Sequence, residues 1–410
     1  MARPATEGPV AAQPTAAAAS GSGTEAKLGR NVVALGWVAF FGGLGQDMIQ
    51  PLLPTFYTQV LGLNKEFIGL IEGALMTTVS LMKIAAGYIS DALGLRKAVV
   101  FAGYALSAAA RIGLGVVGSG AGVLALRLSD GVGKGLKDAP RDTLVAGAAG
   151  GRRLGFAFGI QRALDTLGSV AGPLIAYWLL NQWVDHSSRY REVFLVGGLV
   201  AAIPLVIIGL VVQERKAPVA KQRLSLASLK GSFAGFLAVT LLFTLGNSSD
   251  AFLILRAQGL GVAAITIPLV YALFNLVSSA AAIPAGQLSD RIGRRRAITY
   301  GWLIYGVTYL GFALVRQAWA VWVLYALYGL FYALTEGSGK ALVAEYTPEA
   351  NRGTAYGLYN ASVGVMALPA SLIAGALWNR VSPAAPFAFG AVMAFAAVVG
   401  LMLVPKPQAA

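Results

Sequence analysis

The sequence predicts an all-α membrane protein whose twelve transmembrane helices form two pseudo-symmetric six-helix bundles. The chain of 410 residues is 57% hydrophobic and only 12% charged, which is about half the charge of a soluble domain. Its apolar residues gather into blocks of about 20 residues, the length that a helix needs to cross a bilayer. Two segments half a chain apart also share one pattern, which indicates an internal duplication.

The apolar blocks follow one another along almost the whole chain. They number twelve and are centred near residues 45, 78, 107, 134, 168, 203, 243, 275, 306, 333, 365 and 394. The first six form the predicted N-terminal bundle, residues 31–213, and the last six form the C-terminal bundle, residues 231–405. Residues 214–230, with five basic residues and Pro218, are the expected cytoplasmic linker between the bundles.

The two ends of the chain lie outside these blocks. Residues 1–30 are rich in Ala, Pro, Gly, Ser and Thr without periodicity, a composition typical of a disordered tail. They lack a cationic start followed by an apolar core, so we expect the first block to target the chain to the membrane. Residues 406–410 form a short C-terminal tail.

The duplication is visible in two pairs of short segments. Gly87–Val99 reads GYISDALGLRKAV and Gly286–Ile298 reads GQLSDRIGRRRAI, which places Asp91 and Asp290 199 positions apart. The segments GFAFG and GTAYG, which begin at Gly155 and Gly353, lie 198 positions apart. A nearly constant offset of about half the chain indicates two copies of one helical module, as in many membrane transporters.

Basic residues concentrate in alternate loops between the blocks. The loops after the second, fourth, sixth, eighth and tenth blocks hold most of the arginine and lysine, and the other loops hold few. This asymmetry places the basic loops in the cytoplasm, and the even number of spans places both termini there. We therefore expect a multi-pass protein of the cytoplasmic (inner) membrane, and we attribute the net charge of +14 to its loops and not to nucleic-acid binding.

The residue types limit the chemistry that the chain can perform. There is no cysteine and a single histidine, His186, which excludes disulfides, thiolate metal sites and imidazole clusters. No nucleophile–base pair and no phosphate-binding Gly-x-x-x-x-Gly-Lys-Ser/Thr sequence is present. We expect no enzymatic activity, no cofactor, no metal and no drive by ATP.

Three motifs resemble those of the major facilitator superfamily (MFS) over residues 31–405. The loop after the second block, Gly87-x-x-x-Asp91-x-x-Gly94-x-Arg96-Lys97, recurs as Gly286-x-x-x-Asp290-x-x-Gly293-x-Arg295-Arg296. The fourth block holds Arg127-x-x-x-Gly131-x-Gly133, and the fifth holds Gly168-x-x-x-Gly172-Pro173, which is similar to a motif of exporters. The longer stretch 127–173, which contains KGLKDAPRD, resembles an uncharacterised bacterial branch of the superfamily. The resemblance implies the MFS fold and transport by alternating access.

The repeated loop motif is interpreted as a gate. Its aspartate can accept hydrogen bonds from a neighbouring helix N-terminus, its glycine allows a tight turn, and its cations can face lipid phosphates. Such a loop would hold the cytoplasmic ends of the bundles together in one state and release them in the other. The alternative is a basic loop that only sets topology. The gating residues are Asp91, Gly94, Arg96, Lys97, Asp290, Gly293, Arg295 and Arg296.

Several ionisable residues lie within the apolar blocks, where charges are costly and usually pair or line a cavity. Most are predicted to hold the helices together as a structural charge network. Its members are Lys83, Asp130, Lys134, Asp138, Arg141, Asp165, Glu336 and Lys340. Arg127 and Arg162 are the cations expected to remain free for an anionic group.

A proton carrier is expected among the carboxylates that have no cation one helical turn away. Asp47 ranks first because it lies mid-span among glycines and glutamines, and Glu72 and Asp250 follow. The alternative for Asp47 is a salt bridge to another helix, for example to Arg162 or Lys83. Substrate contacts are expected from polar and aromatic residues of the spans, each of which could instead serve packing. These candidates are Gln46, Gln50, Asn247, Tyr271, Asn275, Tyr328 and Asn360.

The second half repeats the frame of the first but not its charges. Residues 198 positions after Asp138 and Arg127 are Glu336 and Tyr325, so an acid persists and the arginine does not. The C-terminal half is therefore more apolar and aromatic, which suits an amphipathic organic substrate.

The leading functional hypothesis is a monomeric proton-coupled antiporter for efflux of a drug or metabolite. Its expected partners are a small-molecule substrate, protons and membrane lipids. One alternative is proton-coupled uptake of a nutrient such as a siderophore or organic anion. Another alternative, from a different class, is a non-transporting membrane scaffold or sensor.

Overall fold

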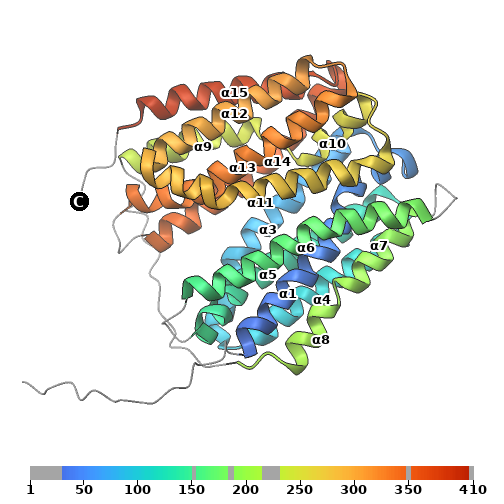
Figure 1. Ribbon diagram of the computed structural model, residues 1–410, viewed down its shortest axis with the longest axis vertical. Coiled ribbons are helices and arrows are strands. Elements are labelled where there is room, and N and C mark those ends of the chain that lie inside the picture. Colours follow the sequence, from blue (N-terminus) through green and yellow to red (C-terminus); the bar gives the residue numbers. More distant parts are fainter. Residues whose placement is uncertain (1–29, 150–153, 183–188, 215–230, 348–351, 406–410) are drawn as a thin grey trace, which may run out of the picture.

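The computed structural model describes residues 30–149, 154–182, 189–214, 231–347 and 352–405, and the regular elements in these ranges are all helical. Eleven helical segments are long and apolar enough to cross a membrane. The twelfth span, α5 (Gly120–Ala149), has the length but carries seven charged residues. The predicted all-α fold with twelve spans is confirmed (Figure 1).

Each half of the chain forms one bundle (Figure 1). The N-terminal bundle contains α1 (Arg30–Ile49), η1 (Gln50–Leu52), α2 (Leu53–Thr55), η2 (Phe56–Val60), α3 (Lys65–Leu93), α4 (Arg96–Leu114), α5, α6 (Leu154–Gln182), α7 (Arg189–Val200) and α8 (Ile203–Leu210). The C-terminal bundle contains α9 (Ser232–Gly246), α10 (Asp250–Gly259), η4 (Ala264–Thr266), α11 (Ile267–Ile292), α12 (Arg294–Leu314), α13 (Ala318–Tyr346), α14 (Arg352–Arg380) and α15 (Ala385–Leu403). The predicted tail 1–30, linker 214–230 and tail 406–410 lie almost entirely outside the described residues.

The first span of each bundle is interrupted deep in the membrane. In the N-terminal bundle α1 passes into the 3-10 helix η1 at Gln50, where Pro51 provides no N–H for a helical hydrogen bond. In the C-terminal bundle α9 ends at Gly246 and α10 begins at Asp250, with the Ser249 hydroxyl accepting a hydrogen bond from the backbone N–H of Ala251 at 3.2 Å. Irregular backbone within a membrane span must face protein or a cavity, and Leu52 and Leu53 beside the first break are buried.

The two bundles share one packing pattern, which glycines make visible. Gly131 of α5 lies against Leu75 and Thr78 of α3, and Gly329 of α13 lies against Phe274 and Val277 of α11. The partners in these two contacts differ by 198 positions on one helix and by 199 on the other. A second pair of contacts, Leu126 on Gly113 and Leu324 on Gly311, shows the same 198-residue offset. The predicted duplication is thus present in the side-chain packing.

The bundles meet along two helix pairs, α3 with α14 and α6 with α11. Gly69 and Gly73 of α3 lie directly against the α14 backbone at Ser371 and Leu368, which brings the two helices into close contact. We call the end of the bundles that holds Gly94 and Gly293 the motif end. The bundles converge at the opposite end, where Gln258 donates a hydrogen bond to Thr55, and they lie farther apart at the motif end (Figure 1).

Candidate functional site

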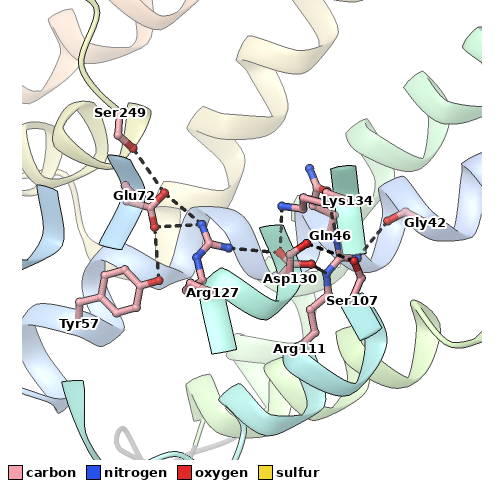
Figure 2. A network of polar contacts seen from close by, with 10 residues as sticks. All are labelled: Gly42, Gln46, Tyr57, Glu72, Ser107, Arg111, Arg127, Asp130, Lys134 and Ser249. Carbon is pink, nitrogen blue, oxygen red and sulfur yellow. Dashed lines mark hydrogen bonds and ion pairs between the residues drawn. The ribbon is translucent and has the colours of Figure 1, made fainter. Parts of the chain in front are cut away.

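A buried ion pair joins α3 and α5 near the centre of the molecule (Figure 2). One Arg127 nitrogen donates to both carboxylate oxygens of Glu72, at 2.9 and 3.0 Å, and the two side chains are only 2% and 1% exposed. The Tyr57 hydroxyl donates to the same carboxylate at 3.4 Å. Ser249, which belongs to the other bundle, donates to it at 3.5 Å. Glu72 therefore links the N-terminal bundle to the break between α9 and α10.

The ion pair continues into a larger cluster around Asp130 (Figure 2). The Asp130 carboxylate lies 3.3 Å from Arg111, 3.0 Å from Lys134 and 3.6 Å from Arg127. Arg111 also donates to the Gln46 side chain at 3.2 Å and to the Gly42 carbonyl at 3.4 Å, which brings α1 into the cluster. We call Gln46, Glu72, Arg111, Arg127, Asp130 and Lys134 the polar network. It joins four helices of one bundle.

The polar network corrects two sequence-based expectations. Arg127 was expected to remain free for an anionic group, but two buried carboxylates already hold it. Glu72 was expected to be an isolated acid, but its partner lies 55 positions away on another helix, beyond the reach of local spacing rules. Arg111 was missed, although an arginine within an apolar block is itself a signal of a buried partner.

Asp47 lies beside the polar network without an ion pair of its own. Its side chain is 5% exposed, and no cation of the described chain comes within salt-bridge distance of it. Its hydrogen-bond partner is the Ser169 hydroxyl of α6, and Asp165, Lys134 and Arg111 lie in its electrostatic surroundings. The alternative pairing is not observed, because Lys83 binds Asp138 at 2.9 Å and Arg162 binds Glu336 at 3.0 Å.

Asp250 occupies the corresponding region of the C-terminal bundle. It begins α10, and its carboxylate accepts a hydrogen bond from the Tyr328 hydroxyl at 2.6 Å. Tyr271 of α11 is buried within the electrostatic reach of both Asp47 and Asp250, one acid from each bundle.

The other predicted substrate contacts occupy different places. Asn275 donates to the Ser169 carbonyl at 2.7 Å and therefore connects α11 to α6 across the bundle interface. Asn247 lies at the end of α9 and Gln50 at the start of η1, each beside a helix break. Asn360 is exposed on α14, one helical turn before Gly364, which lies against Ser80 of α3. Among the described residues, Gln46, Asn275 and Tyr328 make side-chain hydrogen bonds to other helices.

A cavity of about 800 Å³ opens at the motif end, between α6, α11 and α13. Arg162 and Glu336 line it and form an ion pair across the bundles, and Arg162 also lies 4.0 Å from Asp165. Asp290, Arg294 and Lys340 lie on the same wall. Glu336 and Lys340 were both assigned to the structural charge network, and among the described residues Glu336 binds the arginine of the other bundle. Arg162 is therefore engaged in a contact between bundles.

The remaining charges of α5 bind neighbouring helices of the same bundle. Lys83 and Asp138 join α3 to α5, and Arg141 donates to the Tyr104 hydroxyl of α4 at 3.3 Å. The Lys137 ammonium lies 4.2 Å from the centre of the Tyr104 ring, a cation–π contact. These contacts are those expected of a network that holds α3, α4 and α5 together.

The repeated loop motif ties the last helix of each bundle to its own bundle. Gly94 and Gly293 have φ angles of 63° and 89° and end α3 and α11, as expected for tight turns. The Lys97 ammonium donates to the Gly209 carbonyl of α8 at 3.1 Å. Arg295 donates to the carbonyls of Leu401 and Val404 at the end of α15.

These contacts correct the expectation that the motif cations face lipid phosphates. Arg96 is buried, and Lys97 and Arg295 satisfy helix-end carbonyls that lack partners within their helices. Asp290 is exposed at the cavity, whereas the side chain of Asp91 lies outside the described residues. Within those residues, no group of three or more His, Cys, Asp or Glu side chains is placed to hold a metal.

Two pseudo-symmetric helical bundles, with ionisable side chains between them and a cavity open at one end, define a membrane transporter. A family model of the Major Facilitator Superfamily matches residues 35–254 and again residues 231–410. The chain belongs to this superfamily and is a multi-pass transporter of the MFS type.

Known proteins similar to this chain agree with that assignment. An uncharacterised MFS-type transporter of Methanocaldococcus jannaschii is 35% identical over 386 residues, which cover 92% of this chain and 95% of the relative. Multidrug resistance protein MdtH of Aeromonas hydrophila is 30% identical over 155 residues, 38% of each chain. The fold matches the crystal structure of the nucleoside transporter NupG with a TM-score of 0.78 at 14% identity, covering 92% of this chain and 100% of that one.

Proposed function

We propose that this protein is a secondary transporter that exports a small organic compound in exchange for protons, with Asp47 as the proton carrier. The observation that carries the proposal is the position of Asp47, a buried carboxyl without an ion pair beside a network of charges. An isolated acid within a membrane bundle is costly to keep charged and is therefore a natural site for a proton. The two bundles would rock about the centre and expose this site to one side at a time.

The charge balance around Asp47 gives protonation a large local effect. Asp47, Glu72 and Asp130 carry three negative charges, and Arg111, Arg127 and Lys134 carry three positive charges. Asp165 adds a further negative charge to the surroundings of Asp47, and protonation of Asp47 makes the local charge more positive by one unit. Because the site is buried, such a change acts through a low effective dielectric and strongly alters the affinity for any charged substrate.

Asp47 also lies where a change of charge can reach the bundle interface. Its partner Ser169 belongs to α6, and the carbonyl of the same Ser169 accepts the hydrogen bond from Asn275 of α11. The contact between α6 and α11 is one of the two surfaces along which the bundles meet. Protonation of Asp47 would therefore act directly on a contact that rocking must change.

The direction of transport is proposed from the helix that faces Asp47. Gly168 and Gly172 of the exporter-like motif lie against the α1 backbone at Phe40–Leu44 and Leu44–Met48. The motif thus forms the surface against which the proton carrier is held. The partial similarity to multidrug resistance protein MdtH also favours efflux of organic compounds.

The proposal can be tested in everted membrane vesicles from a bacterial host that overproduces the protein. After respiration acidifies the lumen, the pH gradient is followed with acridine orange while ethidium, chloramphenicol or norfloxacin is added. An exporter of this kind should release luminal protons when its substrate is added to the bath. Asp47→Asn should abolish the release, and Asp142→Asn, at an exposed carboxylate, should preserve it. A response of equal size in Asp47→Asn vesicles would contradict the proposed carrier.

A further inference from the structure

The polar network has a tyrosine counterpart in the C-terminal bundle. The shared glycine contacts fix the equivalence of positions, with an offset of 199 from α3 to α11 and of 198 from α4 to α12 and from α5 to α13. At these offsets a tyrosine stands at the position equivalent to each of five charged residues. Glu72, Arg111, Arg127, Asp130 and Lys134 correspond to Tyr271, Tyr309, Tyr325, Tyr328 and Tyr332.

Three of these tyrosines, together with Phe274, form a group of rings that we call the aromatic cluster. The Phe274 ring centre lies 5.6 Å from that of Tyr271, 5.4 Å from Tyr328 and 5.2 Å from Tyr332. Tyr328 and Tyr332 are 5.2 Å apart. These rings belong to α11 and α13. The three tyrosines occupy the positions that hold charged residues of the polar network in the other bundle.

Asp250 is the acid that faces this cluster. Tyr328 donates to its carboxylate at 2.6 Å, and Tyr271 and Tyr332 lie within its electrostatic reach. Among the described residues it forms no salt bridge, and unlike Asp47 it has no nearby set of cations that balances its charge. Its side chain is half-buried.

We infer that Asp250 and the aromatic cluster bind the positively charged nitrogen of an organic cation, and that the substrate class is therefore amphipathic cations. This inference rests on the proposed transport of small organic compounds. A carboxylate supplies the counter-charge, and ring faces attract a cation that has shed its water. The first-turn position of Asp250 in α10 explains why a helix tolerates the acid, but it does not explain why three tyrosines of the cluster lie within its reach.

The inference is tested by ligand binding to the purified full-length protein, measured as the shift of its unfolding temperature in detergent. The probes are benzyltrimethylammonium and tetraphenylphosphonium, with tetraphenylborate as an anion of nearly the same shape as the second. We expect saturable stabilisation by at least one cation and none by tetraphenylborate. Asp250→Asn should weaken the apparent affinity by about tenfold or more, because it removes the counter-charge.

Three further variants separate a binding role from a structural one. Asp250→Glu keeps the charge and should restore most of the cation affinity, Tyr332→Leu should weaken it, and Asp142→Asn should leave it unchanged. The inference is overturned if neither cation stabilises the wild type, if tetraphenylborate stabilises it equally, or if folded Asp250→Asn responds as the wild type does. Cation binding that depends on Asp250 would stand even if the vesicle assay showed no proton exchange, so the two proposals can fail separately.

Discussion

The two bundles use the same helix packing and fill their centres in opposite ways. In the N-terminal bundle, Arg127, Asp130 and their partners form a buried ionic network. In the C-terminal bundle the equivalent positions hold tyrosines, whose rings pack while one hydroxyl binds Asp250. A buried ion pair contributes little net stability but is costly to break, whereas an aromatic core tolerates the loss of one hydroxyl. The duplicated frame therefore holds ionic contacts at the centre of one half and aromatic packing at the equivalent positions of the other.

The largest difference in stability between the two bundles is expected when Arg127 and its counterpart Tyr325 are replaced. Arg127→Leu should lower the free energy of unfolding by about 3–5 kcal/mol, because it leaves Glu72 buried without a cation, whereas Asp130 keeps Arg111 and Lys134. Tyr325→Phe removes only a hydroxyl and should cost about 1 kcal/mol or less. Both are measured by denaturation in sodium dodecyl sulfate in mixed micelles. Recovery of stability in the double variant Glu72→Leu/Arg127→Leu would confirm the unpaired acid as the cause, and equal losses in the two single variants would contradict the comparison.

Two tyrosines that donate to buried acids provide the next comparison. Tyr328→Phe should lower the free energy of unfolding by about 1.5–3 kcal/mol, because its 2.6 Å bond is the one side-chain hydrogen bond that Asp250 accepts within the described residues. Tyr57→Phe should cost less, about 0.5–1 kcal/mol, because its bond of 3.4 Å is long and Glu72 keeps Arg127. The same denaturation measurement applies. A larger loss at Tyr57 would show that the acid of the ionic network, and not Asp250, depends on its tyrosine.

The matched glycines test how tightly each bundle packs. At Gly329 an added methyl group would lie 2.9 Å from the Phe274 carbonyl oxygen and 3.0 Å from the Val277 side chain. At Gly131 the nearest atoms are 3.2 Å away, and one of them belongs to a leucine side chain that can move. Gly329→Ala should therefore cost about 1–3 kcal/mol, and Gly131→Ala should cost less. The comparison fails if thermal unfolding ranks the two variants in the reverse order.

The smallest effect is expected at the ion pair between the bundles. Arg162 and Glu336 approach to 3.0 Å, close to the 2.9 Å of Arg127 and Glu72, but their side chains are 63% and 48% exposed. Water screens this pair, so Arg162→Ala should change the free energy of unfolding by less than about 1 kcal/mol. Comparing the denaturation of Arg162→Ala with that of Arg127→Leu measures how burial changes the contribution of an ion pair, because the N–O distances of the two pairs are nearly the same. A large loss in Arg162→Ala would mean that this contact carries more of the bundle interface than its exposure suggests.

The helical frame could be predicted from the sequence because its signals are local. Apolar blocks reveal spans, and the glycines of the repeated loop, Gly94 and Gly293, adopt the positive φ angles that tight turns require. The superfamily could be predicted from the repeated loop motif, because two copies of this motif at equivalent places in the two halves are not expected to arise by chance.

The partners within the site could not be predicted in the same way. Glu72 and Arg127 are 55 positions apart, and Arg162 and Glu336 are 174 apart, so only the fold brings them together. The tyrosine counterparts were present in the sequence, and the offset that reveals Tyr325 also reveals Tyr328 and Tyr332. The role proposed for these tyrosines depends on Asp250, which lies at the start of α10 after a helix break in another span.

The ties from Lys97 to α8 and from Arg295 to α15 have a consequence for how force passes through the molecule. Each tie fastens the last helix of a half to the other helices of the same half, so that a tilt would carry all the helices of that half together. The contacts that such a tilt has to change are those of α3 with α14 and of α6 with α11.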